Sequence, residues 1–255
     1  MGSSRLKIAL TLSLATNLVA ASGAGYFVHK RGGLCYLHAK LARASGKGRT
    51  TRSHRYYHNR VSLFKRLPNR RQDIYLVGDS ITDMGEWHEL LSAPTARNRR
   101  ISGDTTAGVL RRLDEVIEGR PAKIFLMCGI NNIRNRVPAE RTIEEYGAIL
   151  HKLQGLGTET QIHVQSVLPV NRAKYKESFA PRYAGAHVPK NAEVKALNRS
   201  LMALADRYAN VRYIDLSRLT DTNGELAAEY TLDGLHLNGA GLIAWAQTIK
   251  PFLRN

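Results

Sequence analysis

Asp73-Ile-Tyr-Leu-Val-Gly-Asp-Ser-Ile-Thr-Asp83 is the stretch of sequence that decides the expected fold class. Four apolar residues, Ile74 to Val77, run directly into Gly78. A continuous apolar run that ends at a glycine turn is typical of a strand buried on both faces, as in a parallel sheet. In open α/β sheets, ligands bind just beyond the carboxyl ends of the strands. Ser80 falls at such an end, so it is a candidate nucleophile if a base elsewhere in the chain takes its proton.

Downstream of this stretch, strand-like and helix-like segments alternate to the end of the 255-residue chain. Alternation of this kind forms a parallel sheet with helices on both faces. We therefore expect an α/β domain with a five-stranded parallel sheet between two layers of helices. The predicted strands are 74–77, 97–102, 123–128, 161–168 and 211–214. The predicted helices are 85–91, 105–118, 139–156, 192–208 and 239–252, with a long loop over 169–190.

The net charge of +17 is concentrated at the N-terminal end of the chain. Residues 1–73 contain 15 Lys and Arg against one acid, a net +14, whereas residues 74–255 contain 23 against 20, a net +3. A nucleic-acid-binding domain carries a basic face of its own, so we expect no nucleic-acid partner for the α/β domain. The two cysteines, Cys35 and Cys128, are too few for a disulfide framework.

Residues 8–28 form an uncharged segment of 21 positions between basic flanks. A helix of ~20 residues spans a bilayer, so one interpretation is an uncleaved signal anchor. The other is a signal peptide that is cleaved near Ala20–Ala24. We expect membrane attachment by a single N-terminal helix. If the segment is an anchor, the basic residues that follow it favour a cytoplasmic domain. Cleavage would instead export the domain, for example to a periplasm. The side that the domain faces therefore stays open.

Residues 29–72 form a basic linker with 13 Lys and Arg and no acid. Directly after a membrane segment, such a run is either a contact for anionic lipid head groups or a solvated linker. Near its end, Tyr57, Val61 and Phe64 recur at helical spacing. They predict a short amphipathic helix that packs on the domain and ends before Pro68. The expected divisions of the chain are therefore 1–28, 29–72 and 73–255.

Small polar clusters follow each of the first three predicted strands, at residues 78–80, 102–105 and 129–132. The carboxyl ends of parallel strands share one edge of the sheet, so these clusters converge. Acyl transfer requires a nucleophile, a base and donors for the oxyanion of the tetrahedral intermediate. Ser80 is the candidate nucleophile. The backbone N–H groups of Gly103 and Ser80 and the side-chain amide of Asn131 are candidate oxyanion donors.

Asp233 and His236 lie just before the last predicted helix. Three residues apart, they can place the carboxylate against one imidazole nitrogen and leave the other facing Ser80. The G-x-S-x-G elbow of α/β-hydrolases is absent, since Thr82 occupies the position of its second glycine. The remaining histidines show no metal-ligand spacing such as H-E-x-x-H. We therefore expect no metal and no cofactor.

The motifs GDSIT, ISGDTT, GINN and DGLHLN, in this order and spacing, resemble the four sequence blocks of the SGNH, or GDSL-type, hydrolases. The resemblance covers residues 74–253 and extends to bacterial GDSL esterases and to platelet-activating-factor acetylhydrolases, which share Asn132. It implies a flavodoxin-like three-layer fold and metal-free ester hydrolysis through an acyl-serine. It also implies Ser80 as nucleophile and oxyanion donor, Gly103 and Asn131 as the other oxyanion donors, His236 as base and Asp233 as its partner.

The prediction for function is a serine esterase that hydrolyses acetyl or other short-chain esters of a carbohydrate or lipid. An O-acyltransferase that uses the same site is one alternative. A non-catalytic, membrane-tethered binding module is another. The sequence does not identify the alcohol part of the substrate, because the shape of a pocket depends on loops that hydrophobic periodicity does not describe.

Further expectations concern the surroundings of Ser80. We expect Asp79 to order its turn through hydrogen bonds with backbone N–H groups, and Asp104 to cap the helix that begins at Thr105. The loop 169–190 is the candidate wall or lid of the substrate site. Close relatives in the family that this chain resembles often have Gly at the position of Arg100. The sequence leaves open whether the Arg100 side chain reaches the pocket.

Overall fold

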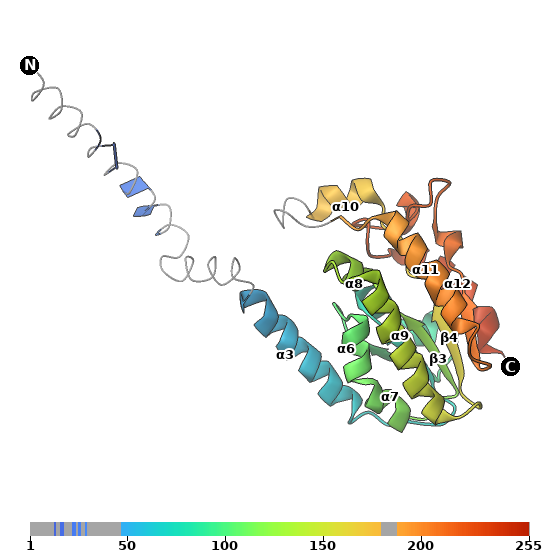
Figure 1. Cartoon of the computed structure of the whole chain (residues 1–255). Coiled ribbons are helices and arrows are strands. Elements are labelled where there is room, and N and C mark those ends of the chain that lie inside the picture. Colours follow the sequence, from blue (N-terminus) through green and yellow to red (C-terminus); the bar gives the residue numbers. More distant parts are fainter. Residues whose placement is uncertain are drawn as a thin grey trace, which may run out of the picture. The chain divides into compact units, whose positions relative to one another are not determined.

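The computed structural model describes residues 13, 16–17, 22–23, 25–26, 29, 47–179 and 188–254 (Figure 1). The chain divides into two compact units, residues 1–58 and 59–255. The predicted N-terminal hydrophobic helix over 8–28 lies largely outside the described residues. Among the described residues, no helix has both the length and the apolar character needed to cross a bilayer.

A five-stranded parallel sheet forms the centre of the second unit, as predicted. Its strand order is β2-β1-β3-β4-β5, which is the flavodoxin-like order. The strands are β1 (Ile74–Gly78), β2 (Ala96–Arg100), β3 (Lys123–Met127), β4 (Gln161–Gln165) and β5 (Val211–Ile214). The chain leaves β1 toward β2 on one side, and β3 then pairs with the other side of β1. This reversal makes the carboxyl ends of β1 and β3 the expected ligand-binding edge.

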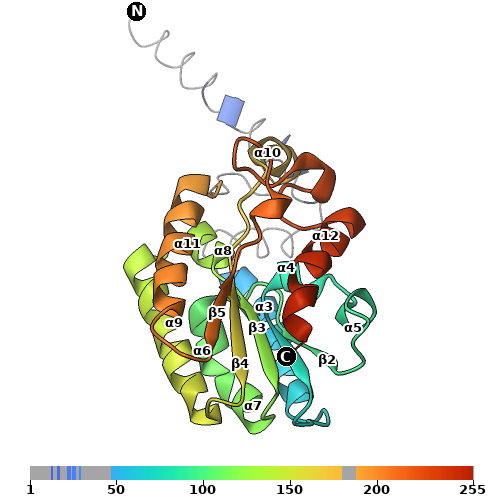
Figure 2. The same ribbon diagram turned by 90° about the vertical axis from the view of Figure 1, so that its right-hand side faces the viewer.

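Helices cover both faces of the sheet. Figure 2 shows α6, α9 and α11 on one side of the sheet and α5 and α12 on the other. Helix α9 packs between α6 and α11, and α12 packs against α5. The α-helices are α3 (Lys47–Phe64), α4 (Ser80–Asp83), α5 (Trp87–Leu90), α6 (Thr106–Arg111), α7 (Leu113–Glu118), α8 (Ile130–Arg134), α9 (Ala139–Leu153), α10 (Arg172–Phe179), α11 (Asn191–Ala205) and α12 (Gly239–Ile249). The 3-10 helices are η1 (Gln154–Leu156), η2 (Ser217–Leu219), η3 (Ala228–Tyr230) and η4 (Lys250–Leu253).

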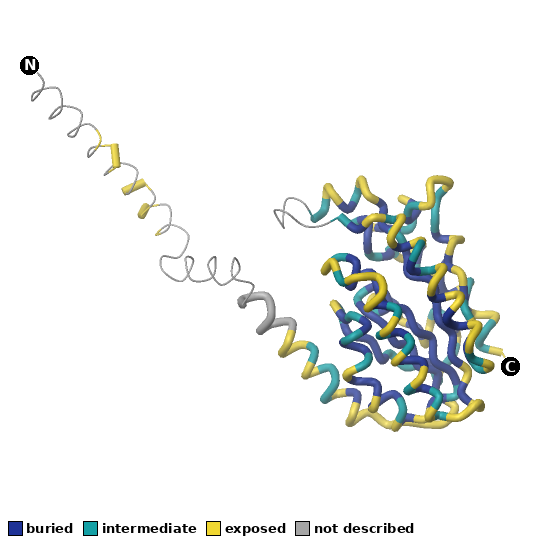
Figure 3. Tube along the Cα trace, viewed as in Figure 1, coloured by how far each residue is buried: buried dark blue, intermediate teal, exposed yellow. Residues whose placement is uncertain are grey.

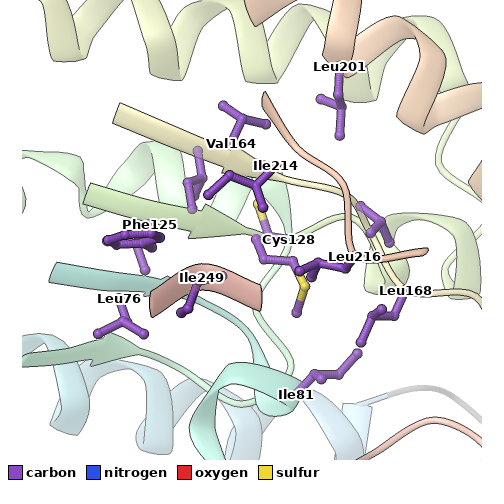
Figure 4. Close-up of a cluster of buried hydrophobic side chains, with 14 of the residues drawn as sticks. Leu76, Ile81, Phe125, Cys128, Val164, Leu168, Leu201, Ile214, Leu216 and Ile249 are labelled. Carbon is purple, nitrogen blue, oxygen red and sulfur yellow. The ribbon is translucent and has the colours of Figure 1, made fainter. Parts of the chain in front are cut away.

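The apolar core lies on both faces of the sheet, which is the dark blue interior of the second unit in Figure 3. All five residues of β1 and all five of β3 are buried. Full burial of a Leu, Ile, Val or Phe side chain contributes ~1.5–3 kcal/mol, so these central strands hold the layers together. Figure 4 shows side chains from the strands together with side chains of α11 and α12, among them Leu76, Phe125, Val164, Ile214, Leu201 and Ile249.

Two tryptophans join the α5–α12 layer. The rings of Trp87 and Trp245 meet edge to face with centroids 4.7 Å apart. The Trp87 indole donates a hydrogen bond to the Thr82 carbonyl at 2.8 Å, and the Trp245 indole donates one to Gln165 Oε1 at 2.6 Å. Both side chains are therefore part of the core.

Two predicted segments differ from the structure. The helix expected over 105–118 is two helices, because α6 ends at Arg111 and α7 begins at Leu113. The intervening Arg112 is buried and directs its side chain to Asp104 and Glu115. The loop expected over 169–190 contains helix α10, whose sequence shows no apolar period and buries only Tyr175. Residues 180–187 of that loop lie outside the described residues.

The amphipathic helix expected before Pro68 is the end of α3. Phe64, the last residue of that helix, is 1% exposed, and the guanidinium of Arg99 lies over its ring at 5.4 Å. Val61 is half-buried, whereas Leu67 lies after the helix and is exposed. One apolar residue of the predicted set therefore anchors this end of the helix.

Candidate active site

Ser80 begins helix α4 directly beyond the buried strand β1. The preceding Asp79 caps this helix, since its Oδ1 accepts the Ile81 N–H at 3.0 Å. This is the turn-ordering role expected for Asp79. Gly78 permits the close approach of β3, because a Cβ there would lie 2.4 Å from the Met127 carbonyl oxygen. Burial raises the pKa of the Asp79 carboxyl to about 7.

The structure brings Ser80, His236 and Asp233 together across 156 residues of sequence. His236 Nε2 lies 3.0 Å from Ser80 Oγ, and His236 Nδ1 lies 2.7 Å from Asp233 Oδ2. The second Asp233 oxygen accepts the N–H groups of Leu235 at 2.9 Å and His236 at 2.7 Å. The imidazole therefore has one nitrogen on a carboxylate and the other on the hydroxyl of the candidate nucleophile.

Opposing effects act on the Asp233 carboxyl. Burial favours a higher pKa, but hydrogen bonds from the side chain and backbone of His236 and from the Leu235 N–H outweigh it and lower the pKa to about 2. Asp233 is therefore ionised at neutral pH. An ionised carboxylate fixes the tautomer of the imidazole and stabilises the imidazolium that forms when His236 takes a proton.

The loop that carries Asp233 and His236 is held from two sides. Thr231 Oγ1 donates to the His236 carbonyl oxygen at 2.7 Å and accepts the Gly234 N–H at 2.9 Å. Gly234 has a φ of +83°, which favours glycine. A Cβ at Gly234 would lie 2.3 Å from the backbone nitrogen of Tyr175, so α10 packs directly on this loop.

The candidate oxyanion donors follow the strands on either side of Ser80. Asn131 lies in the first turn of α8, beyond β3, and its Nδ2 donates to the Asp104 carbonyl oxygen at 2.9 Å. The same nitrogen lies 3.4 Å from Asp79 Oδ2. Gly103, beyond β2, has a φ of +83° and open space where a side chain would be. Gly103 and Asn131 are therefore joined through Asp104, next to the turn that holds Ser80.

Asp104 is not the helix cap that its position suggested. Thr105 caps α6, with its hydroxyl accepting the Gly108 N–H at 3.2 Å. The Asp104 carboxylate instead accepts the Arg112 Nε–H at 2.8 Å, and both side chains are buried. Arg112 also donates to the Arg99 carbonyl oxygen at 2.8 Å. The buried ion pair thus ties the Gly103 turn to the end of β2, and its geometry could not be read from the motif.

Arg100, the last residue of β2, contacts the helix that begins at Ser80. Its Nε is 3.3 Å from Asp83 Oδ1, and its Nη1 donates to the Thr82 carbonyl oxygen. Ser102 Oγ donates to the other Asp83 oxygen at 2.6 Å. Burial lowers the pKa of Arg100 to about 10. These contacts connect the last turn of α4 to the end of β2.

Helix α10 supplies the described part of the predicted substrate wall. Tyr175 and Phe179 stack with ring centroids 4.5 Å apart, and the Phe179 ring lies 6.5 Å from that of His236. Arg182, Tyr183 and His187, which belong to the same predicted loop, lie outside the described residues. Among the described residues, no group of three or more His, Cys, Asp or Glu side chains is arranged to hold a metal ion.

One residue next to the site was missed in the sequence. Arg134 ends α8 and donates from Nη1 to Asn131 Oδ1 at 3.1 Å and from Nε to Tyr175 Oη at 3.0 Å. A signal was present, because positions three apart on a helix face each other, and Arg134 follows Asn131 at that spacing. None of the four sequence motifs includes Arg134, so only its contact with α10 in the structure identifies it as a residue of the site.

The chain matches known proteins over this domain. The model of the GDSL-like Lipase/Acylhydrolase family matches residues 76–242. The chain belongs to this family. The platelet-activating factor acetylhydrolase IB subunit alpha2 of Rattus norvegicus is 30% identical over 201 residues, which cover 76% of this chain and 79% of that protein. The Homo sapiens subunit matches to the same extent.

Solved structures agree with this family assignment. A Streptococcus pneumonia protein named for platelet activating factor has a TM-score of 0.73 at 28% identity and covers 84% of this chain and 99% of its own. A carbohydrate esterase family 3 protein from Talaromyces cellulolyticus has a TM-score of 0.55 at 19% identity, covering 71% and 96%, and shares the fold. As a GDSL-like acylhydrolase, the chain is an enzyme of the hydrolase class, and the family supports an esterase activity.

Proposed function

We propose that this GDSL-like acylhydrolase is a serine esterase that cleaves acetyl or other short-chain esters of a carbohydrate or lipid through an acyl-serine. The observation that carries the proposal is the unbroken series of hydrogen bonds from Ser80 through His236 to Asp233. The names of the relatives support the acyl group, since they are acetylhydrolases. The carbohydrate esterase that shares the fold supports a sugar as one possible alcohol part.

The first half of the reaction forms the acyl-enzyme. His236 Nε2 takes the Ser80 proton as Oγ bonds to the ester carbonyl carbon, and the carbonyl electron pair moves to oxygen. The oxyanion accepts hydrogen bonds from the N–H groups of Ser80 and Gly103 and from Asn131 Nδ2. The intermediate collapses as His236 gives the proton to the departing alcohol oxygen. Each such donor is worth ~2.7–4 kcal/mol of transition-state stabilisation.

The second half returns the free enzyme. His236 takes a proton from water as the water oxygen bonds to the acyl carbon, and the same donors hold the second oxyanion. Collapse breaks the bond to Ser80 Oγ, which takes the proton back from His236, and releases the carboxylic acid. Throughout, the ionised Asp233 stabilises the positive charge that forms on the ring of His236.

The test is hydrolysis of p-nitrophenyl esters by the purified full chain, comparing acetate with longer acyl chains. We expect turnover that is highest for acetate and that Ser80→Ala reduces by about 10³-fold or more, with an unchanged melting temperature. Ser200→Ala, at an exposed serine of α11, is the matched control. Wild-type turnover that does not depend on Ser80 would refute the esterase. Transfer of the acyl group to an added sugar acceptor would identify an O-acyltransferase, and absence of both reactions a binding module.

We also propose that residues 8–28 attach the enzyme to a membrane and that the basic segment 29–72 contacts anionic lipid. The support is the sequence alone: an uncharged run of 21 residues followed by 13 basic residues without an acid. Membrane fractionation and the N-terminal peptide of the mature protein test this. A soluble mature chain that begins near Ala20–Ala24 would contradict the anchor and favour export after cleavage.

A further inference from the structure

Arg134 bridges two groups that belong to different parts of the site. Its guanidinium donates to Asn131 Oδ1 on one side and to the Tyr175 hydroxyl on the other, at 3.1 and 3.0 Å. The aromatic rings of Tyr175 and Phe179 lie 6.0 and 5.6 Å from its central carbon. The side chain is half-buried. A planar guanidinium suits this double contact, because its donors point in fixed directions.

The contacts with Arg134, Asp104 and Asp79 together decide which way the Asn131 amide faces. An Asn amide has an acceptor side and a donor side of nearly the same shape. Here the acceptor, Oδ1, faces the Arg134 cation, while the donor, Nδ2, faces the Asp104 carbonyl oxygen and the Asp79 carboxyl. In the reversed orientation, an oxygen would face two other oxygens and an NH₂ group would face a cation. The arrangement therefore keeps Nδ2 on the side of the Ser80 turn.

The same cation lies behind the place where negative charge develops in ester hydrolysis. A donor that is already oriented costs no reorganisation when the oxyanion forms, and a nearby positive charge strengthens the effect in a water-poor site. The hydrogen bonds of Arg134 go to Asn131 and Tyr175, whereas Ser80 and His236 pair with each other. Its influence on the reaction therefore passes through Asn131, through Tyr175 and helix α10, or through the electric field of its charge.

Helix α10 connects this arrangement to the base. Tyr175, which accepts the Arg134 Nε–H, lies on a helix that begins against the Asp233–His236 loop. Asn171, just before the helix, donates its N–H to the Gly234 carbonyl oxygen at 2.9 Å. Helix α10 and Arg134 therefore connect the Asp233–His236 loop to the Asn131 amide.

We propose that Arg134 is a positioning residue for ester hydrolysis, which holds the Asn131 amide in its donor orientation and places a positive charge behind it. The proposal rests on the esterase function proposed above. Because the oxyanion exists only after attack on the ester, Arg134 contributes to kcat rather than to substrate binding.

The first test compares Arg134→Met, Arg134→Lys and Tyr175→Phe in the full chain with p-nitrophenyl acetate. Arg134→Met lowers kcat about 10- to 100-fold, less than or equal to the loss of a direct donor, with KM within about twofold. Arg134→Lys regains part of kcat, since the charge remains and the forked contact does not. Tyr175→Phe, which removes the acceptor of the Nε–H and leaves the Asn131 contact in place, has a smaller effect. Arg141→Met, at an exposed arginine of α9, is the matched control.

The second test is a double-mutant cycle with Asn131→Ala. If Arg134 acts through Asn131, Arg134→Met causes a smaller fold-loss of kcat in the Asn131→Ala background than in the wild type, and the loss that remains is the effect of its positive charge. Multiplying losses would overturn the proposal, as would an Arg134→Met enzyme with wild-type kcat or with a change in KM alone. If Arg134→Met does not fold, Arg134→Lys and Tyr175→Phe decide by the same split between kcat and KM. Failure of the esterase proposal is distinct, because wild type itself would then show no Ser80-dependent turnover.

Discussion

His236 and His163 are two histidines of the same domain in opposite surroundings. His236 lies in a loop with its side chain 21% exposed, and both of its ring nitrogens have polar neighbours, Asp233 and Ser80. His163 lies in β4 and is 2% exposed. Neither of its ring nitrogens has a hydrogen-bond partner among the described residues. Its ring stacks on Phe125 with centroids 4.6 Å apart and meets Phe252 edge to face at 5.5 Å.

The difference shows that surroundings, not residue type, decide whether a histidine transfers protons. Burial, together with the positive charges of Lys123 and Arg212, lowers the pKa of His163 to about 4. His163 therefore stays neutral at physiological pH and packs as an aromatic ring. His236 has a carboxylate to stabilise its charged form and a hydroxyl to exchange a proton with. Only His236 is equipped as a base.

Replacing each histidine in turn gives the largest expected difference in kcat. His236→Gln should lower kcat by about 10⁴- to 10⁶-fold, because Ser80 loses its proton acceptor. His163→Phe should leave kcat and KM unchanged, since its ring contacts only core side chains. Steady-state hydrolysis of p-nitrophenyl acetate measures both. Similar losses in the two variants would show that the comparison is wrong.

Protonation of the buried His163 should lower the stability of the folded chain as the pH falls. The unfolded chain protonates His163 near pH 6.5, but the folded chain does so only near pH 4. As the pH falls between these values, protons bind the unfolded state preferentially, so the folded state loses stability by ~3 kcal/mol in total. Above pH 6.5 this loss is absent.

Urea unfolding at pH 7 and pH 4.5 isolates the contribution of His163. We expect the wild type to lose ~2–3 kcal/mol more than His163→Phe between these two pH values. The test compares the change in unfolding free energy of the wild type with that of the variant. Carboxyls with a raised pKa, such as Asp79, make the folded state more stable as the pH falls, but they do so equally in both proteins. Parallel pH dependences in wild type and variant would mean that His163 is not held neutral.

The smallest expected effect concerns the support of the His236 loop. Thr231→Val keeps the shape of a buried side chain but removes its bonds to the His236 carbonyl and the Gly234 N–H. The free energy of unfolding should fall by ~1–2 kcal/mol, and kcat should fall far less than in His236→Gln. Chemical denaturation and steady-state kinetics measure the two effects. A loss of kcat as large as that of His236→Gln would show that Thr231 takes part in the reaction itself.

Hydrophobic pattern predicted the central strands closely and the polar elements poorly. Strands β1 and β3 were found because both of their faces are buried, which makes nearly every residue apolar. Strand β2 has the sequence ARNRR and is located from its place in the alternation. Its buried Arg99 and Arg100 lie near Glu115 and Asp83, and no periodicity reveals such ion pairs. Helix α10 was missed because a helix that buries one side chain has no apolar stripe.

The motifs predicted which residues gather at the site but not what supports them. Ser80 lies in the motif GDSIT and His236 in the motif DGLHLN, so the pairing of these two residues over 156 residues of sequence could be predicted. Arg134 contacts Asn131 of its own helix, a pair whose spacing the sequence shows, but its contact with Tyr175 and that of Arg112 with Arg99 join residues from different elements. Such contacts depend on packing in three dimensions, and the sequence around either arginine carries no signature of them.

Labelling with a fluorophosphonate tests the central claim most directly. The probe bonds to a serine Oγ with loss of fluoride only when a base activates that hydroxyl. Peptide mass spectrometry of the labelled full chain should show the adduct on Ser80, with none in Ser80→Ala and strongly slowed labelling in His236→Gln. Absence of an adduct on Ser80 in the wild type, or equal labelling rates with and without His236, would contradict the account.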